Sequence, residues 1–425
     1  RKEIIVETTK LKIYNIDAAV LALHKLVPDA ETLKGWKNKG IHISIICDND
    51  VVAEKLSRSF EGVTGEIHIL PQKGANGNNN YKSILKKRIK RPGAGLKKTI
   101  FITDHPSFIS KMKPAEIALS AGLCDIENCK KAFYDSGADI VLRSIEDIII
   151  RKDEGGNPRF SQTIPGIFKQ FDHFTSSLEN RKPVFFFDYD GTLTPIINDP
   201  EKAYIGKEKK KLLKKLSSAH NVAIVSGRDM MDIRQFIGLN NLIYAGSHGF
   251  RISGPDGLYM MQEKAVDLLP GLDRMEKELV NTLEKEIPGV SIERKHFAIA
   301  IHYRNAPPGS FVTVNDHADR LIAGNDNFKK GRGKKILEIK PSLDWHKGKA
   351  VEWIMNELGF SFPGEYLPMY IGDDITDEDA FRTLSDDGIG ILVGSHSQLS
   401  AARYHLRDVD EVGKFLDYLV SSPVI

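Results

Sequence analysis

Two aspartates separated by one residue, Asp188 and Asp190, come directly after a strongly apolar segment and open the run Asp-Tyr-Asp-Gly-Thr-Leu-Thr-Pro. The segment Val184–Phe187 has the composition of a buried strand, and ligands of open α/β sheets bind where such strands end. One carboxylate there can attack a phosphorus atom while the other transfers the proton of the leaving group. The plain alternative is a strand-end turn, because Asp and Gly favour turns.

Two further polar groups occupy positions that suit a phosphoryl group. Ser226-Gly227-Arg228 follows a predicted strand at 221–225 and precedes a helix, so its hydroxyl and backbone amides can bind phosphoryl oxygens. Lys347 opens a predicted helix and can neutralise phosphoryl charge from there. Each has an ordinary alternative, since Ser is a common helix N-cap and Lys is usually a solvated charge.

An acidic cluster gives the second strong signal. The run from Gly372 to Asp379 contains five carboxylates and follows a short apolar strand. Carboxylates gathered at a strand end repel one another unless a positive charge offsets them, and Mg²⁺ binds one or two carboxylates together with a substrate phosphate. A helix N-terminus explains Asp377 and Glu378, but it explains Asp373 and Asp374 less well. The strand ends together predict one site for metal and phosphate.

The elements that must position these groups follow the alternating strand and helix pattern of an α/β protein. We predict a catalytic core formed by residues 182–251 and 336–425. Residues 252–335 depart from the pattern, with a long helix and alternating strands, and are predicted to be an inserted α+β block. Residues 1–152 are predicted to be a separate α/β domain, and residues 153–181 a linker with a connecting helix.

Composition and charge exclude other classes of protein. The chain has 425 residues, 41% hydrophobic and 28% charged, which is a globular balance long enough for two to three domains. No apolar stretch approaches the roughly 18 residues of a membrane helix. The net charge of +3 gives no overall field for nucleic acid. The three cysteines are too few for a disulfide framework, so we expect a reducing compartment.

These signals resemble the four motifs of the haloacid dehalogenase (HAD) superfamily of phosphotransferases: the Asp-x-Asp pair, the Ser, the Lys and the acidic loop. Five longer runs resemble the trehalose-6-phosphate phosphatases within it, namely Gly246–Gly249, Glu293–Lys295, His302–Asn305, Glu338–Pro341 and Gly372–Phe381. The match begins at about Lys182 and covers a little over half of the chain. Lys340 stands where many members have Arg, which keeps the charge and loses the planar fork.

The resemblance implies Mg²⁺-dependent hydrolysis of trehalose 6-phosphate to trehalose and phosphate, through an aspartyl-phosphate on Asp188. Asp190 would protonate the departing sugar oxygen and then activate water. Ser226 and Lys347 would hold the phosphoryl oxygens. Mg²⁺ would be bound by Asp188, by the backbone carbonyl of Asp190 and by Asp373. The resemblance also implies a Rossmann-like HAD core, with the inserted block as a cap over the site.

Polar residues of the cap and of its junctions would bind the sugar. The predicted substrate-binding residues are Gly227, Arg228, His248, Glu293, Lys295, His302, Arg304, Asn305 and Glu338. Strand alternation places Glu293 and Lys295 on one face of a strand, and His302 and Arg304 on one face of another. The alternative for these charges is a solvent-facing sheet surface.

The first domain is predicted to be a second, degenerate HAD-like fold. Ile13–Val20 aligns with Phe186–Leu193, which puts Asn15 at the position of Asp188, and an amide cannot form an acyl-phosphate. The predicted elements there are strands at 11–15, 41–47, 67–70, 99–103 and 140–142 and a helix at 17–37. The alternative is an unrelated α/β domain.

Two other functions remain open at this point. One is another capped HAD sugar-phosphate phosphatase or phosphomutase, and the other is a non-catalytic sugar-phosphate sensor or scaffold. The presence of both aspartates, Ser226, Lys347 and Asp373 argues against the second. We expect a cytoplasmic monomer in trehalose biosynthesis, with a trehalose-phosphate synthase as partner and neither nucleic acid nor membrane as a ligand.

Overall fold

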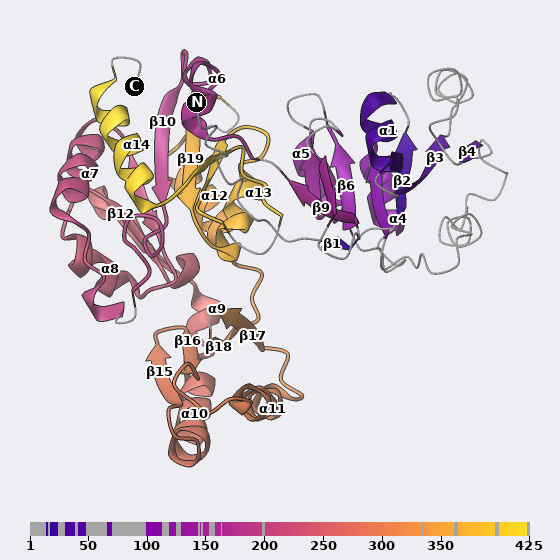
Figure 1. The fold of residues 1–425 in the computed structure, drawn as a ribbon. Coiled ribbons are helices and arrows are strands. Elements are labelled where there is room, and N and C mark those ends of the chain that lie inside the picture. Colours follow the sequence, from indigo (N-terminus) through magenta and orange to yellow (C-terminus); the bar gives the residue numbers. More distant parts are fainter. Residues whose placement is uncertain are drawn as a thin grey trace, which may run out of the picture. The chain divides into compact units, whose positions relative to one another are not determined.

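The fold is described from a computed structural model (Figure 1). The residues that it describes are 14–15, 18–23, 30–38, 41–47, 66–69, 99–112, 119–124, 129–142, 145, 148–152, 158–162, 164–197, 200–333, 335–360, 364–395 and 399–422. Among these residues, no helix combines the length and the apolar character needed to cross a membrane.

A six-stranded sheet, parallel at every neighbouring pair, lies in the N-terminal part of the chain. Its strands, in spatial order, are β4 (Glu66–Ile69), β3 (His42–Cys47), β2 (Ala18–Leu23), β5 (Thr99–Thr103), β6 (Leu119–Leu123) and β7 (Ile140–Leu142). The helices among the described residues of this part are α1 (Ala30–Asn38), α4 (Pro106–Met112) and α5 (Lys130–Asp135). The parallel sheet confirms the predicted α/β class, whereas descent from a degenerate HAD-like fold stays a prediction.

The predicted position of Asn15 is wrong. Asn15 ends β1 (Tyr14–Asn15), which pairs antiparallel with β9 (Pro158–Gln162) in a three-stranded sheet completed by β8 (Ile148–Lys152). The middle of the parallel sheet is instead β2, in a segment predicted to be helical, and α1 begins only at Ala30. A short apolar run suits a strand with parallel neighbours on both sides, so β2 takes this place and Asn15 does not correspond to Asp188.

Two of the cysteines are paired. Cys124 follows β6 and Cys129 precedes α5, and they form a disulfide with Cα atoms 6.1 Å apart. The structure therefore pairs two of the three cysteines, and the reducing compartment stays a prediction.

The catalytic part is built on an eight-stranded sheet. Its strands, in spatial order, are β14 (Tyr259–Met261), β13 (Arg251–Ser253), β12 (Ile243–Gly246), β11 (Val222–Val225), β10 (Lys182–Phe187), β19 (Tyr366–Gly372), β20 (Ile389–Val393) and β21 (Tyr404–Leu406). β10 pairs in parallel with β11 and β19, whereas β13 and β14 are antiparallel. The helices of this part are α6 (Phe171–Ser176), α7 (Lys207–Ala219), α8 (Met230–Ile237), α12 (Lys347–Glu357), α13 (Glu378–Thr383) and α14 (Val409–Ser421).

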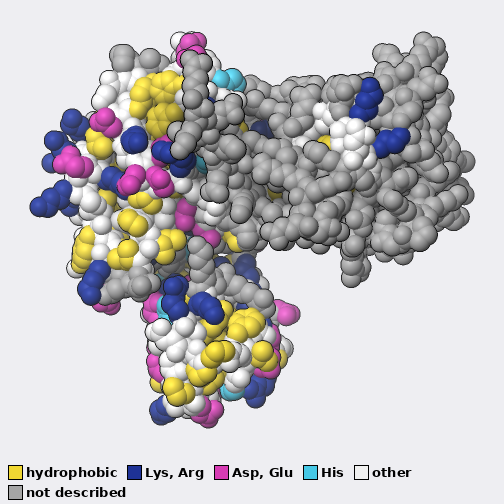
Figure 2. Space-filling view, viewed as in Figure 1, with side chains coloured by type: hydrophobic (Ala, Val, Ile, Leu, Met, Phe, Trp, Pro, Cys, Tyr) yellow, Lys and Arg dark blue, Asp and Glu magenta, His cyan; other side chains and the backbone are white. Residues whose placement is uncertain are grey.

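Apolar burial explains why β10 holds its place. Phe185, Phe186 and Phe187 are each fully buried, as expected for a parallel strand covered on both faces. On α7, Leu213 and Leu216 are buried, whereas Lys207, Lys211, Lys214 and Lys215 are exposed. On the face shown in Figure 2, basic side chains of this part are interspersed with acidic ones and form no continuous patch.

A separate four-stranded antiparallel sheet forms the cap. Its strands, in spatial order, are β15 (Ser291–Lys295), β16 (Ala298–His302), β18 (Ile336–Pro341) and β17 (Phe328–Gly333). The short helix α9 (Glu263–Val266) precedes α10 (Leu269–Leu279), and α10 and α11 (Ser310–Ile322) contribute to the apolar core beneath the sheet. The alternating burial of β18 is that of a half-buried strand, so β18 belongs to the cap, whereas β13 and β14 extend the core sheet. The cap therefore begins after β14 rather than at residue 252, and it includes residues 336–341, which were predicted to belong to the core.

Candidate active site

Asp188 and Asp190 lie where β10 ends at the carboxyl edge of the core sheet. The backbone N–H of Asp188 donates to the carbonyl of Ile371 on the neighbouring β19, at 2.8 Å. The chain then turns sharply at Gly191, whose φ of 85° favours glycine. Between the two aspartates, Tyr189 is fully buried and donates its hydroxyl to the carbonyl of Ala203. The buried tyrosine fixes the turn, and the two carboxylates lie on either side of it in sequence.

Lys347 makes a buried ion pair with Asp188. Its Nζ lies 2.9 Å from Asp188 Oδ1, and the two side chains are 2% and 7% exposed. Lys347 is the first residue of α12, where the helix dipole disfavours a cation, and burial adds a desolvation cost. The fold tolerates this lysine because a carboxylate faces it. The arrangement provides a fixed positive charge beside the proposed nucleophile.

The loop after β11 brings Ser226 and Arg228 to the same edge. Ser226 is buried, its backbone N–H donates to Ala245, and its hydroxyl accepts from the N–H of Arg228. The guanidinium of Arg228 faces Asp190 and binds both of its carboxylate oxygens, Nε to Oδ2 and Nη2 to Oδ1, each at 2.6 Å. Arg228 was predicted to bind substrate, and this pairing with Asp190 was not predicted.

Three carboxylates converge where a divalent cation can bind. One carboxylate oxygen from each of Asp188, Asp373 and Asp377 lies within 4.8 Å of the others. Asp377 is fully buried and accepts the backbone N–H of Asp374, which fixes the acidic loop as a reciprocal cap. Glu378 is not one of these three carboxylates, and its Oε2 accepts a hydrogen bond from the backbone N–H of Ala401. Hard oxygen donors in this number suit Mg²⁺.

The predicted metal site is thus reproduced in part. Asp188 and Asp373 lie together as predicted, and Asp377 joins them, although the sequence favoured a helix-terminus role for it. The carboxylate of Asp190 is not among the three, and metal binding by its backbone carbonyl stays a prediction.

One face of the cap sheet is polar and the other is apolar. Ile299, Ile301 and Ile339 point into the apolar core beneath the sheet. Register pairs Glu293 with Ala300, and Ala300 with Glu338, so alternation places the charged residues on the opposite face. The members of this polar face are Glu293, Lys295, His302, Glu338 and Lys340.

The polar face is organised by two ion pairs. Lys295 Nζ lies 2.6 Å from Glu338 Oε1, and His302 Nε2 lies 2.7 Å from Glu293 Oε2. Burial by itself would raise the pKa of Glu338, but the charges of Lys295 and Lys340 and the hydrogen bond from Lys295 outweigh burial and hold this pKa well below its usual value. The hydrogen bond from His302 lowers the pKa of Glu293. The two pairs hold these four side chains in fixed positions on the polar face.

Arg304 and Asn305 lie outside this arrangement. β16 ends at His302, so both residues belong to the following turn, and both are exposed. The prediction that Arg304 shares a strand face with His302 is therefore wrong, because the strand is two residues too short.

His248 lies between the core and the polar face of the cap. Its backbone is left-handed, with φ of 58°, and its N–H donates to the carbonyl of Ser226. A Cβ at Gly227 would come within 2.9 Å of the imidazole, so Gly227 permits this approach. Burial, together with the charges of Lys340 and Lys347, lowers the pKa of His248 to about 3. His248 is therefore a neutral imidazole at neutral pH.

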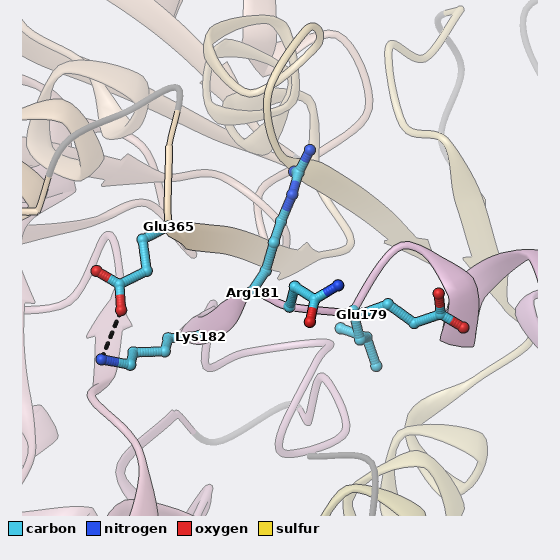
Figure 3. A pocket seen from close by; sticks show the side chains of 6 residues that line it. Glu179, Arg181, Lys182 and Glu365 are labelled. Carbon is cyan, nitrogen blue, oxygen red and sulfur yellow. Dashed lines mark ion pairs between the residues drawn. The ribbon is translucent and has the colours of Figure 1, made fainter.

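A surface cavity of about 500 Å³ lies at the other end of β10. It is lined by Leu178, Glu179, Asn180, Arg181, Lys182 and Glu365, and Lys182 pairs with Glu365 at 2.7 Å (Figure 3). This cavity is at the amino end of the strand, away from Asp188, and contains none of the predicted site residues.

Comparison with known proteins decides the family. Residues 186–410 match the model of the family described as Trehalose-phosphatase. The chain belongs to this family. A trehalose-phosphate phosphatase of Mycobacterium tuberculosis is 33% identical over 332 residues, which cover 77% of this chain and 82% of that protein. A probable trehalose-phosphate phosphatase D of Arabidopsis thaliana is 36% identical over 266 residues, covering 60% of this chain and 72% of that protein.

A solved structure supports the fold of this trehalose-phosphatase family member. The C-terminal domain of a trehalose-6-phosphate phosphatase from C. albicans aligns with a TM-score of 0.52 and 24% identity, over 60% of this chain and 98% of that one. As a member of the family, the chain is a phosphoric monoester hydrolase.

Three features of this trehalose-phosphatase site were missed from the sequence. They are the pairing of Arg228 with Asp190, the place of Asp377 beside Asp188, and the contribution of Lys340 to the polar face. The place of Asp377 beside Asp188 could have been inferred from the spacing of Asp373 and Asp377 on a tight turn. No local signal links Arg228 to Asp190, which is 38 residues away.

Proposed function

We propose that this chain hydrolyses trehalose 6-phosphate to trehalose and inorganic phosphate, with Asp188 as nucleophile, as a step of trehalose biosynthesis. The observation that carries the proposal is the buried pair of Asp188 with Lys347, beside Asp373 and Asp377. A carboxylate at the end of a buried strand, with a cation on one side and a metal site on the other, suits attack on a phosphate.

The reaction proceeds in two displacements. A carboxylate oxygen of Asp188 forms a bond to phosphorus while the bond from phosphorus to the sugar oxygen breaks, and Asp190 gives its proton to that oxygen. Trehalose leaves and an aspartyl-phosphate remains on Asp188. Water then attacks phosphorus, Asp190 accepts its proton, and the bond between phosphorus and Asp188 breaks. The sum is one ester and one water converted to one alcohol and one phosphate.

Charge stabilisation comes from residues fixed by the core. Lys347 and the hydroxyl of Ser226 are positioned to bind phosphoryl oxygens, and preorganised donors of this kind contribute much of the rate enhancement in phosphoryl transfer. Mg²⁺ would be held by Asp188, Asp373 and Asp377, with the backbone carbonyl of Asp190 as a further ligand. When bound, it supplies positive charge that neutralises the phosphate and the approaching carboxylate.

The cap is proposed to recognise the sugar. Glu293, Lys295, His302 and Glu338 present donors and acceptors from one sheet face, and neutral His248 faces them from the core. A disaccharide offers many hydroxyl groups, and a site built to hydrogen-bond them rejects substrates that lack them. Arg304 and Asn305, on the exposed turn, are proposed to reach the sugar when the cap closes.

The test is phosphate release from trehalose 6-phosphate, glucose 6-phosphate, sucrose 6-phosphate and mannose 6-phosphate, each with Mg²⁺ and with a chelator. Mg²⁺-dependent release largely confined to trehalose 6-phosphate supports the proposal. Equal release from all four sugars contradicts the role of the cap, and no release from any of them contradicts the activity. A cytoplasmic location, a monomeric state and a synthase partner stay predictions.

A further inference from the structure

The side chain of Arg228 is held in place by aromatic rings of the core. Its guanidinium lies over the ring of Phe236, 5.0 Å from the centroid, and 5.7 Å from that of Tyr189. These two rings stack on each other, and Tyr204 packs edge-on against Phe236. Aromatic faces attract a guanidinium and restrict its movement. The side chain of Arg228 is only 15% exposed.

The backbone of Arg228 is fixed as well. Its N–H donates to the hydroxyl of Ser226, and its carbonyl accepts the N–H of Ser247 at 2.7 Å. Backbone and side chain of Arg228 are thus both restrained by groups of the core.

The fixed guanidinium determines where the Asp190 carboxylate can lie. Nε and Nη2 each donate to a different oxygen of Asp190 at 2.6 Å, which sets both the position and the plane of the carboxylate. A bidentate fork pairs with the carboxylate form, because guanidinium can only donate hydrogen bonds. In the proposed reaction Asp190 is a carboxylate during the second displacement, when it accepts a proton from the attacking water. The fork therefore holds Asp190 in the form that this second step needs.

We propose that Arg228 is a positioning residue for Asp190 rather than a ligand of the sugar, and that it acts mainly on hydrolysis of the aspartyl-phosphate. The inference rests on the proposed two-step function. Arg228 holds the Asp190 carboxylate in the orientation in which it takes the proton of the attacking water. Delivery of a proton to the sugar oxygen in the first displacement requires Asp190 to leave this fork on at least one side.

Removal of Arg228 should slow the second displacement, hydrolysis of the aspartyl-phosphate, more than the first. Without the fork the Asp190 carboxylate turns freely, so the second displacement loses its oriented base while the first retains Asp188, Lys347 and the metal site. In Arg228→Ala, trehalose is then released in a burst of about one per active site before phosphate appears, and the phosphorylated enzyme accumulates. We expect kcat to fall about 10²-fold, within the range for one oriented acid–base group, with KM changed less than about threefold.

The experiment compares trehalose and phosphate in the same rapid-quench samples, with Mg²⁺ and trehalose 6-phosphate, for the parent, Arg228→Ala and Arg228→Lys. Arg234→Ala is the matched control, because Arg234 is an exposed arginine on α8. Guanidinium ion added to Arg228→Ala is expected to restore phosphate release, whereas urea is not. Arg228→Lys keeps the charge without the fork, so it accumulates the phosphorylated enzyme even if Arg228→Ala folds poorly.

The outcomes separate this inference from the proposed function. Failure of the parent to form trehalose contradicts the function itself. An active parent together with an Arg228→Lys variant that shows a raised KM, unchanged kcat and no burst makes Arg228 a substrate ligand and overturns the inference. A loss of kcat with no trehalose burst and no rescue by guanidinium also overturns it, because the first displacement is then the one that slowed.

Discussion

Lys347 Nζ and Asp188 Oδ1 lie 2.9 Å apart in a site where both side chains are almost completely buried. A helix start is an unfavourable place for a cation, and an apolar core is an unfavourable place for a carboxylate. Each residue therefore depends on the other in the protein without substrate. In the proposed reaction Lys347 turns from Asp188 toward the phosphoryl oxygens that Asp188 attacks.

Breaking this pair from one side should be costly for both folding and activity. Lys347→Met leaves the Asp188 charge buried without its ammonium partner, and we expect the free energy of unfolding to fall by about 3–5 kcal/mol. Asp188→Asn combined with Lys347→Met removes both charges and should restore part of that loss. Urea unfolding of the parent, both single variants and the double variant gives the coupling free energy. Additive losses in this cycle would contradict a direct pair.

Asp373 and Asp377 should both contribute to metal binding, but only Asp377 should also contribute to stability as a cap. Asp373→Ala and Asp377→Ala both remove a hard oxygen donor, so each should raise the Mg²⁺ concentration needed for half-maximal phosphate release. Asp377 also caps the acidic loop, so Asp377→Ala should in addition lower the free energy of unfolding by about 0.5–2 kcal/mol. Mg²⁺ titrations of activity and thermal melts in chelator measure the two effects. An unchanged Mg²⁺ requirement in both variants would remove these residues from the metal site.

The polar face of the cap should control the choice of sugar. Lys295→Met and Glu338→Gln each disrupt a charged hydrogen-bonding pair, and loss of one such bond to substrate is worth about 1.5–3 kcal/mol. We expect KM for trehalose 6-phosphate to rise about 10- to 100-fold, with a smaller change for glucose 6-phosphate. Lys330→Met is the matched control, because Lys330 pairs with Asp319 on the opposite, helix-covered face of the same sheet. Equal effects of Lys295→Met and Lys330→Met would show a general loss of cap structure.

His248 should make the protein less stable in acid. Its pKa is about 3 in the folded protein against an ordinary value of 6.5, so between these pH values the unfolded chain binds a proton that the folded protein does not. The free energy of unfolding therefore falls as pH decreases through this window. His248→Gln removes this contribution and should reduce the slope by up to about 1.4 kcal/mol per pH unit.

Urea unfolding in chelator at about pH 7 and about pH 5 measures this slope, with His317→Gln on α11 as control. A slope in His248→Gln equal to that of the parent would show that His248 is not held neutral by the fold.

The core of the site could be predicted from sequence because its signals are local. An apolar run such as Val184–Phe187 must be buried, and whatever polar residues follow it lie at the sheet edge where ligands bind. Ser226 and Asp373 follow strands in the same way. Parallel neighbours then bring all three strand ends together, so proximity followed from the α/β pattern alone.

The remaining features depend on contacts that local patterns do not encode. Whether Ala18–Leu23 is a helix start or a strand is ambiguous in a short apolar run, and pairing with two parallel strands decides it. Residues 336–341 are an alternating strand that fits either sheet, and only register assigns them to the cap. Arg228 and Asp190 illustrate the same limit for side chains, because their fork is set by the rings of Phe236 and Tyr189.

The role of Asp188 as nucleophile is tested most directly by phosphate release from trehalose 6-phosphate, at saturating Mg²⁺, by the parent protein and by Asp188→Asn. The substitution keeps the size of the side chain and replaces the attacking oxygen with an amide, so melting curves can verify that the variant is folded. We expect rapid release by the parent and release at the uncatalysed background by the folded variant. Turnover by Asp188→Asn equal to that of the parent would contradict Asp188 as the nucleophile.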